Sequence, residues 1–553
     1  MTRLPLCIGL FLLLGQVSTR GEDSPPNIVY IIADDQTWSD FGFMGNDRVY
    51  TPNLDALAEK SLRFPNGYLT TSVCRPSLVT LLTGLYPHQH RVHFNHGPPG
   101  NSGYNKMTSK KIYEETRAKE FELIREVETL PQILTERLGY RCLQTGKFWE
   151  GHHRNGGFSD GMTTFTAPPE GQDFGGVRRL ANGERVAHGN GDVGLQIGRE
   201  TMEPIETFIT DCETEKFPWM VWYAPYLPHQ PHDSPEQYYD LVESTPGVKD
   251  HEIPYYAAIA QFDDTVGELL KIVEERSNLE NTIIVFVSDN GWSPSERPEK
   301  KRPQEFAHTK TSKRAPFDEG IRSPILVRWD GKVSPETRTD LVSSIDIVPT
   351  LLGMTGIPER ANELPGKDLR TKPEPDRAVF GAIYPGDASR LRRPDRDVAY
   401  RWARKGGYKL IVPRGKNPWG AYLKGPALYH VPSDPGEQRN LISDESLRDE
   451  ILDLERELDA WWNPADAGAA IAQNLVAVSQ AAAAGGLFFA VGAENNIDAV
   501  LQAIVRGGRV DDEESPFHGI YFGTPQFDEI DLESAKRYLK ITDGLLEYQN
   551  PGN

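Results

Sequence analysis

The sequence predicts an α/β protein built on a large, doubly wound mixed sheet with helices on both faces. Short, continuous apolar runs rich in β-branched residues, typical of fully buried strands, alternate with longer amphipathic segments typical of helices. Near residue 379 the pattern changes to short strands separated by turn residues. The length of 553 residues suits one large domain and a smaller one.

The elements of the large domain, residues 25–375, follow from these periodicities. A strand is predicted at 27–33 (NIVYIIA), and a helix that begins with Pro52, because proline suits a first helical turn. The other predicted strands are 141–145, 219–224, 282–287 and 325–328, and the other predicted helices are 130–138 and 255–275, with further strand and helix material at 341–352. Such alternation indicates a doubly wound sheet.

Three further segments are predicted outside that domain. Residues 376–463 form a subdomain with a small antiparallel sheet and a last helix at 447–461, and residues 464–553 form a C-terminal extension that opens with an alanine-rich helix. Residues 1–21 have the pattern of an export signal: Arg3, an apolar run at 4–14, then small residues. We expect a periplasmic or extracellular protein without stable membrane insertion, because no apolar run is long enough to span a bilayer.

Charge and cysteine content narrow the function. A formal net charge of -20 argues against nucleic acid as a partner, and it means that an anionic substrate needs a local positive site. Three cysteines remain after the signal, so at least one is unpaired; Cys142 and Cys212 could form a disulfide or both be free. Cys74 is the candidate for chemistry, because an apolar helical run follows it and helix N-termini favour anions.

Two polar clusters follow two predicted strands. Asp34 and Asp35 come after 27–33, and Asp289 and Asn290 come after the strand that begins at Thr282. The carboxyl ends of parallel strands meet at one edge of the sheet, so we expect these side chains to lie together. Carboxylate and amide oxygens suit calcium or magnesium better than zinc. An isolated aspartate at a strand end is more often a helix cap, but two clusters favour a cation site.

These residues resemble the motifs of type I, formylglycine-dependent sulfatases of the alkaline phosphatase superfamily. The resemblance covers residues 27–329 and includes the Cys-x-Pro-Ser step at Cys74, and a further motif, Asp-Pro-Gly-Glu-Gln at 434–438, is similar to the family's C-terminal subdomain. It implies that Cys74 becomes a formylglycine through a maturation enzyme. It also implies calcium, with magnesium as the alternative, held by Asp34, Asp35, Asp289 and Asn290.

The resemblance also implies roles for three basic residues. Lys147 and Lys313 would hold the sulfate oxygens together with His229, which would also protonate the leaving alcohol. One hydroxyl of the hydrated aldehyde would attack sulfur, and the other would then expel sulfate. The chain departs from the family pattern at Leu78, where the family has arginine, and at Trp149, where it usually has histidine.

Nearby histidines and arginines are candidates for substrate binding. His152 or His153 could occupy the space of the histidine that Trp149 replaces. The run His88, His90, His93 and His96 has no standard zinc spacing, so we expect loop residues along the cleft. The segment that contains Arg392 and Arg393 is locally basic, which is usual for a solvated surface and would also suit a sulfated polymer.

The sequence therefore predicts an exported sulfatase that acts on a sulfated carbohydrate. A phosphonate or phosphodiester hydrolase of the same superfamily is the alternative enzyme, although Asn290 stands where such relatives often have histidine. A non-catalytic protein that binds sulfated glycans is the alternative outside catalysis, suggested by Leu78 and Trp149.

Overall fold

The computed structural model describes residues 25–296, 307–372, 375–384, 386–414, 423–466, 539–542 and 545–548. The expected export signal and the alanine-rich helix of the C-terminal extension lie outside the described residues. Within these ranges, no helix is long and apolar enough to cross a membrane. Cys74, Cys142 and Cys212 are all buried and free, so the structure does not pair Cys142 with Cys212.

The main sheet is mixed, as predicted, and its strand order is β11-β2-β10-β9-β1-β8-β4-β5. Its central strands β9, β1, β8 and β4 run parallel, whereas β10 runs antiparallel to both of its neighbours. The bounds are β1 Asn27–Ala33, β2 Leu62–Phe64, β4 Arg141–Gly146, β5 Asp160–Gly161, β8 Trp219–Ala224, β9 Thr282–Ser288, β10 Ile325–Arg328 and β11 Glu336–Thr337. Every predicted strand of this sheet is confirmed to within a residue.

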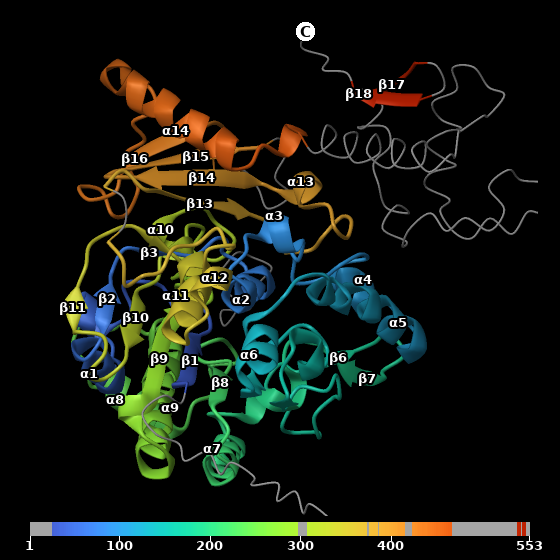
Figure 1. Ribbon diagram of the computed structural model, residues 1–553, viewed down its shortest axis with the longest axis vertical. Helices are drawn as coiled ribbons and strands as arrows, with labels where there is room; N and C mark the ends of the chain where they lie inside the picture. The colour runs from blue at the N-terminus through green and yellow to red at the C-terminus, as the bar shows by residue number, and fades with distance from the viewer. Residues whose placement is uncertain are drawn as a thin grey trace, which may run out of the picture.

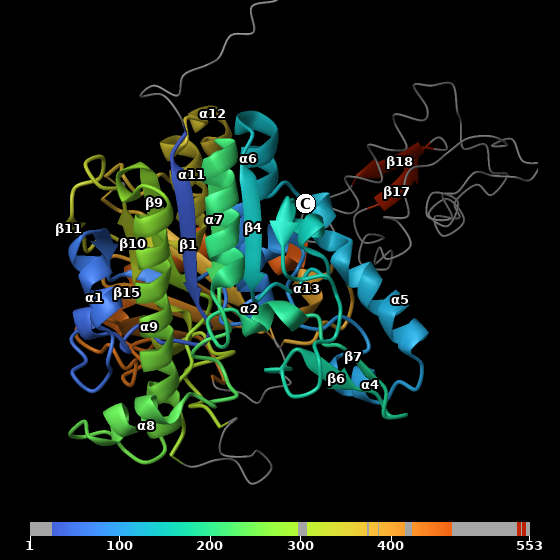
Figure 2. The ribbon, with the colours of Figure 1, turned by 90° about the horizontal axis from the view of Figure 1, so that it is seen from below.

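Helices cover both faces of the sheet. Successive side chains of β1 point to opposite faces and belong to two different apolar clusters. Tyr30 and Ile32 pack on one face against α2 (Cys74–Thr83), α6 (Leu130–Leu138) and α11 (Ile347–Met354). Val29 and Ile31 pack on the other face against α1 (Pro52–Glu59), α7 (Glu203–Glu215) and α9 (Ile253–Arg276). Figure 2 shows α7 and α9 side by side along the strands. This burial of both faces explains the continuous apolar strands of the sequence.

The predicted C-terminal subdomain is also present. Its antiparallel sheet has the order β13-β14-β15-β16, with bounds Ala378–Ile383, Tyr400–Lys405, Tyr408–Pro413 and Ala427–His430, and α14 spans Arg448–Trp461. One face packs on the main domain, where the rings of Trp402 and Tyr68 lie 5.6 Å apart. The other face packs on Leu454 and Leu458 of α14. Figure 1 shows this order of layers, with α14 outermost.

Shorter elements make up the rest of the described helices and strands. The paired strands are β3 Gly67–Tyr68 with β12 Val342–Ser343, β6 Val177–Arg179 with β7 Arg185–Ala187, and β17 Leu539–Thr542 with β18 Leu545–Tyr548. The helices are α3 Pro87–His90, α4 Asn101–Asn105, α5 Lys110–Phe121, α8 Glu236–Glu243, α10 Asp318–Ile321, α12 Pro358–Ala361 and α13 Pro394–Asp397. Several of them border the carboxyl ends of the central strands, where the site lies.

Candidate active site

Four adjacent strands deliver the predicted side chains to one edge of the sheet. Asp289 directly follows β9, Asp34 follows β1, His229 lies in the loop after β8, and Lys147 directly follows β4. Parallel strands place their carboxyl ends together, so residues distant in the sequence converge here. Lys313 reaches the same place from the segment before α10.

The three aspartates and Asn290 form a buried cluster, each no more than 2% exposed. The backbone N–H of Asp35 donates to Oδ1 of Asp289 at 3.0 Å, and Nδ2 of Asn290 donates to Oδ1 of Asp35 at 2.6 Å. Asp35 has a φ of 66°, a left-handed conformation that is uncommon for a residue other than glycine. Such backbone strain is frequent at functional sites.

Two lysines neutralise part of the negative charge of this cluster. Nζ of Lys147 donates to Oδ1 of Asp34 and lies 3.3 Å from Oδ2 of Asp289, and Nζ of Lys313 donates to Oδ2 of Asp35 at 2.7 Å. Burial opposes the charge of Lys147, but Asp289 and Asp34 outweigh it and hold its pKa well above its usual value. Burial likewise opposes ionisation of Asp35, yet Lys313 keeps the pKa of Asp35 below its usual value. Both lysines are therefore charged.

His229 borders the same cluster. Its Nε2 lies 3.4 Å from Oδ2 of Asp35, and its Nδ1 lies 2.6 Å from the carbonyl oxygen of Gln230. The ring stacks on Tyr226 with centroids 4.3 Å apart. Burial lowers the pKa of His229 well below its usual value, although Asp35 acts in the opposite direction. The imidazole is therefore neutral before substrate binds.

Cys74 is the first residue of α2, as the sequence predicted, and it is 1% exposed. Its Sγ belongs to a group of potential ligand atoms, with one atom each from Asp34, Asp35 and His229, that all lie within 4.8 Å of one another. Burial raises the pKa of the Cys74 thiol to about 11. The unmodified residue is therefore a neutral thiol and a poor nucleophile at neutral pH.

The donor set fits a hard divalent cation. Oδ2 of Asp34 and Oδ1 of Asn290 are buried and have no hydrogen-bond partner. Burial, followed by the charge of Asp289, raises the pKa of Asp34 well above its usual value even though Lys147 is adjacent. Buried oxygens of this kind require a compensating positive charge. Asp34, Asp35, Asp289 and Asn290 would hold such an ion.

A buried ion-pair network, not expected from the sequence, anchors the start of α2. The guanidinium of Arg75 lies 2.7 Å from the carboxylate of Glu120 and 2.7 Å from that of Glu150. The backbone N–H of Arg75 donates to Oδ1 of Asn95 at 3.0 Å. All three charged side chains are buried, so the network holds the residue next to Cys74 in one position. No local sequence pattern links these positions.

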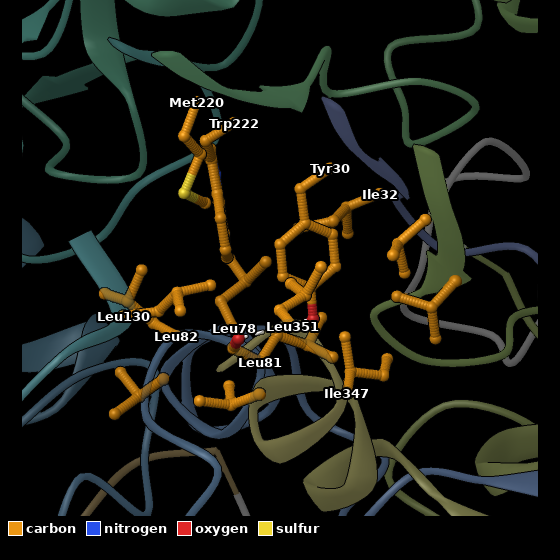
Figure 3. Packing of buried hydrophobic residues seen from close by; sticks show 14 of the residues in the cluster. Tyr30, Ile32, Leu78, Leu81, Leu82, Leu130, Met220, Trp222, Ile347 and Leu351 are labelled. Atoms are coloured by element: carbon orange, nitrogen blue, oxygen red, sulfur yellow. Dashed lines mark hydrogen bonds between the residues drawn. The ribbon is translucent and has the colours of Figure 1, made fainter. Parts of the chain in front are cut away.

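One residue that departs from the family motif, Leu78, is buried among apolar side chains. It is 5% exposed and lies in the core beside Tyr30, Leu81 and Trp222 (Figure 3). An apolar side chain is the natural choice in this environment. Leu78 therefore contributes to packing behind the site.

The second departure, Trp149, is enclosed by histidines that the sequence did not single out for this role. His96 and His188 lie 5.5 Å and 5.4 Å from the Trp149 ring. The structure places the expected His152 and His153 elsewhere: Nδ1 of His152 accepts the N–H of Arg154, and Nδ1 of His153 lies 3.2 Å from the carbonyl oxygen of Thr163. In the described part of the chain, the histidines next to Trp149 are thus His96 and His188.

The other histidines of the run lie apart from one another. His88 stacks on Trp462 at 4.7 Å, His90 lies 3.2 Å from the hydroxyl of Thr80, and Nε2 of His93 lies 2.8 Å from Asp397. Each of these three side chains thus has a partner of its own. Of the four, His96 is the one that contacts Trp149.

Arg392 and Arg393, predicted to bind substrate, each have an acidic partner. Arg392 pairs with Glu126, and Arg393 lies 2.6 Å from Asp395. Arg392 is half-buried, whereas Arg393 is 7% exposed. The structure does not bring either residue into contact with the acidic cluster in the interactions it records, so substrate binding by them stays a prediction.

Comparisons with known proteins show the family of the chain. The family model described as Sulfatase matches residues 26–357, which is more than half of the chain. Arylsulfatase A of Homo sapiens is 26% identical over 471 residues, which cover 78% of this chain and 86% of that protein. The ulvan-active sulfatase of Formosa agariphila is 26% identical over 484 residues, which cover 81% of this chain and 82% of that protein.

Solved structures show the same fold. The structure of Ps i-CgsB superposes with a TM-score of 0.57 at 21% identity and covers 79% of this chain and 93% of that chain. The fold and the site define a sulfuric ester hydrolase. The chain belongs to the sulfatase family and is arylsulfatase-like.

Proposed function

We propose that this sulfatase hydrolyses sulfate esters of a sulfated carbohydrate with a formylglycine derived from Cys74 and a bound calcium ion, magnesium being the alternative. The observation that carries the proposal is the proximity of Cys74 to the acidic cluster, within 4.8 Å for the atoms of Asp34, Asp35 and His229. The unpartnered oxygens of Asp34 and Asn290 support the cation. The ulvan-active relative supports a carbohydrate substrate.

The residues around Cys74 divide the work of sulfate transfer. The modified residue would supply the nucleophilic hydroxyl, and the cation would lower its pKa and withdraw charge from the sulfate group. Lys147 and Lys313, both charged, would stabilise the negative charge that develops on the sulfuryl oxygens. As the S–O bond to the alcohol breaks, His229 would deliver a proton to the departing oxygen. The negative charge of a bound sulfate favours the protonated form of His229.

The proposal includes a place and a maturation partner. The apolar run behind Arg3 supports export to the periplasm or beyond the cell. A formylglycine-generating enzyme would have to oxidise Cys74 while the segment is still unfolded, because the folded chain buries it. Leu78 packs in the apolar core, one helical turn after Cys74 in α2.

Mass spectrometry and activity assays test the proposal together. The protein is produced with and without a formylglycine-generating enzyme, and the mass of the tryptic peptide that contains Cys74 is measured. In the protein produced with that enzyme, we expect a peptide mass that corresponds to an aldehyde in place of the thiol. We also expect faster turnover of 4-nitrophenyl sulfate than of phenyl phosphonate esters. Cys142→Ser is the control, because Cys142 is a buried cysteine without contact to the acidic cluster.

Each alternative has its own outcome. Faster turnover of phosphonate or phosphodiester substrates would indicate the alternative hydrolase. Unmodified Cys74 with no turnover of any sulfate ester, but retained affinity for sulfated glycans, would indicate a binding protein.

A further inference from the structure

A cavity of about 310 Å³ is lined in part by the loops that carry His229 and Asn290. Its walls include the rings of His232, Tyr239 and Trp292, the polar side chains of Asp250 and His251, and two prolines. The His232 ring lies 5.5 Å from the Trp292 ring, so these aromatic groups form one continuous wall. The mechanism proposed above uses none of these residues.

The loops that carry the site also form this wall. His232 stands three residues after His229, and Trp292 stands two residues after Asn290. The hydroxyl of Tyr255 lies 3.0 Å from the carbonyl oxygen of Asp35 and 3.1 Å from that of Trp292. Tyr255 therefore links the backbone of the acidic cluster to the wall of the cavity.

The lining favours an uncharged, ring-shaped ligand with polar edges. Aromatic and proline surfaces suit the apolar face of a sugar ring, and Asp250 and His251 can bond its hydroxyl groups. Burial lowers the pKa of His232 to about 4, so this imidazole is neutral at neutral pH. Among the described residues, neither lysine nor arginine lines the cavity, whereas Asp250 does, so this lining would not attract a second sulfate. The volume is at the lower end of ligand pockets, about 300–1,000 Å³.

We propose that this cavity binds an unsulfated sugar residue adjacent to the residue whose sulfate is removed at Cys74. The enzyme then prefers an oligosaccharide chain to an isolated sulfated sugar. This inference rests on the proposed function, and it adds a specificity site formed by Tyr239, Asp250, His251 and Trp292.

The test blocks the cavity without altering the acidic cluster. His251→Trp fills the space from a half-buried lining position, and Gln237→Trp, on an exposed part of α8 outside the lining, is the matched control. The substrates are 4-nitrophenyl sulfate, sulfated monosaccharides, and the corresponding tetrasaccharides from ulvan, carrageenan and chondroitin sulfate. We expect kcat/KM for one tetrasaccharide to exceed that for its monosaccharide about tenfold, the equivalent of about 1.4 kcal/mol.

His251→Trp should abolish this preference by raising KM for the tetrasaccharide. It should leave turnover of 4-nitrophenyl sulfate within twofold of wild type. Gln237→Trp should change neither the preference nor this turnover. Equal kcat/KM for both chain lengths in the wild type, or a preference that survives His251→Trp, would overturn the inference while turnover of 4-nitrophenyl sulfate upholds the proposed function. An enzyme that hydrolyses 4-nitrophenyl sulfate but none of the oligosaccharides would overturn the inference as well. A protein inactive on all of these esters would instead refute the proposed function, and the inference with it.

Discussion

Two of the buried clusters of carboxylates and cations among the described residues differ in charge balance. At the strand ends, Asp34, Asp35 and Asp289 face the two lysines Lys147 and Lys313. At the junction with the C-terminal subdomain, the two carboxylates of Asp318 and Glu437 face three cations, namely Lys409, Arg322 and Arg404.

This difference in charge balance distinguishes a candidate cation site from a structural contact. At the junction, Oδ1 of Asp318 accepts from Lys409 at 2.7 Å, and Oδ2 accepts from the hydroxyl of Tyr68 at 2.8 Å. At the strand ends, Oδ2 of Asp34 and Oδ1 of Asn290 have no partner. A cluster with excess acid needs a cation from solution, whereas at the junction the cations outnumber the carboxylates.

Replacing Cys74 should have the largest effect on turnover. Cys74→Ala removes the proposed nucleophile, and we expect hydrolysis of 4-nitrophenyl sulfate to fall by about 10⁴-fold or more. The melting temperature should change little, because only one small buried side chain is altered. Cys142→Ala lies in neither cluster and should keep full turnover; activity of Cys74→Ala near the wild-type level would contradict the assignment.

Asp289→Asn breaks the acidic cluster. The substitution keeps the shape but removes a charge that faces Lys147 at 3.3 Å, so we expect turnover to fall about 10³-fold. Added calcium should no longer raise the melting temperature. Steady-state assays and thermal scans with and without calcium measure both effects. A variant that still responds to calcium as the wild type does would remove Asp289 from the metal site.

Lys409→Met disrupts the junction cluster. It should lower the stability of the protein and leave its catalysis nearly unchanged. Lys409 is fully buried between Asp318 and Glu437, and its loss leaves buried carboxylates without their main cation. We expect the free energy of unfolding to fall by about 3–5 kcal/mol, with kcat per folded molecule within twofold of wild type. Denaturant titration and active-site counting measure the two quantities. A large loss of kcat with unchanged stability would reverse the roles of the two clusters.

Asp192 is a third kind of buried carboxylate, with neither a lysine nor a metal site. Its Oδ1 accepts the N–H of Gly189 at 2.8 Å and its Oδ2 has no partner. Burial raises the pKa of Asp192 to about 7, well above the unfolded value of about 3.9. The folded state therefore binds a proton between these pKa values, and stability falls as pH rises from about 4 to 7.

Asp192→Asn should remove this pH dependence. We expect the variant to be more stable than wild type by about 2 kcal/mol at pH 8, since the folded state no longer buries a charged carboxylate at position 192. At pH 4 the two proteins should differ little. Denaturant titrations across this range test the sign; parallel stability profiles for the two proteins would contradict the raised pKa.

The smallest effect concerns Arg392 and Arg393, which lie outside both clusters. Each already pairs with an acid, and such pairs near the surface contribute at most about 1 kcal/mol. If they also contact a sulfated polymer, the double alanine variant should raise KM for polymeric substrates about threefold and leave 4-nitrophenyl sulfate unaffected. Equal change on both substrates would remove them from substrate binding.

The sequence predicted what local patterns and strand ends encode. Residues 130–138 and 219–224 agree with α6 and β8 residue for residue, and Asp34 and Asp289 converge because both follow parallel strands. The partners of Trp149 could not be predicted, since His96 and His188 come from segments that no periodicity links. The same holds for Arg75 with Glu120 and Glu150, whose contact depends on tertiary packing.

Calcium titration by calorimetry tests most directly whether the excess acid at the strand ends binds a cation. Wild-type protein stripped with chelator should bind one calcium ion per chain. Asp34→Asn should abolish this binding, because it removes the charge behind the unpartnered oxygen, whereas Lys409→Met should retain it. Absence of binding in the wild type, or equal affinity in Asp34→Asn, would contradict the account.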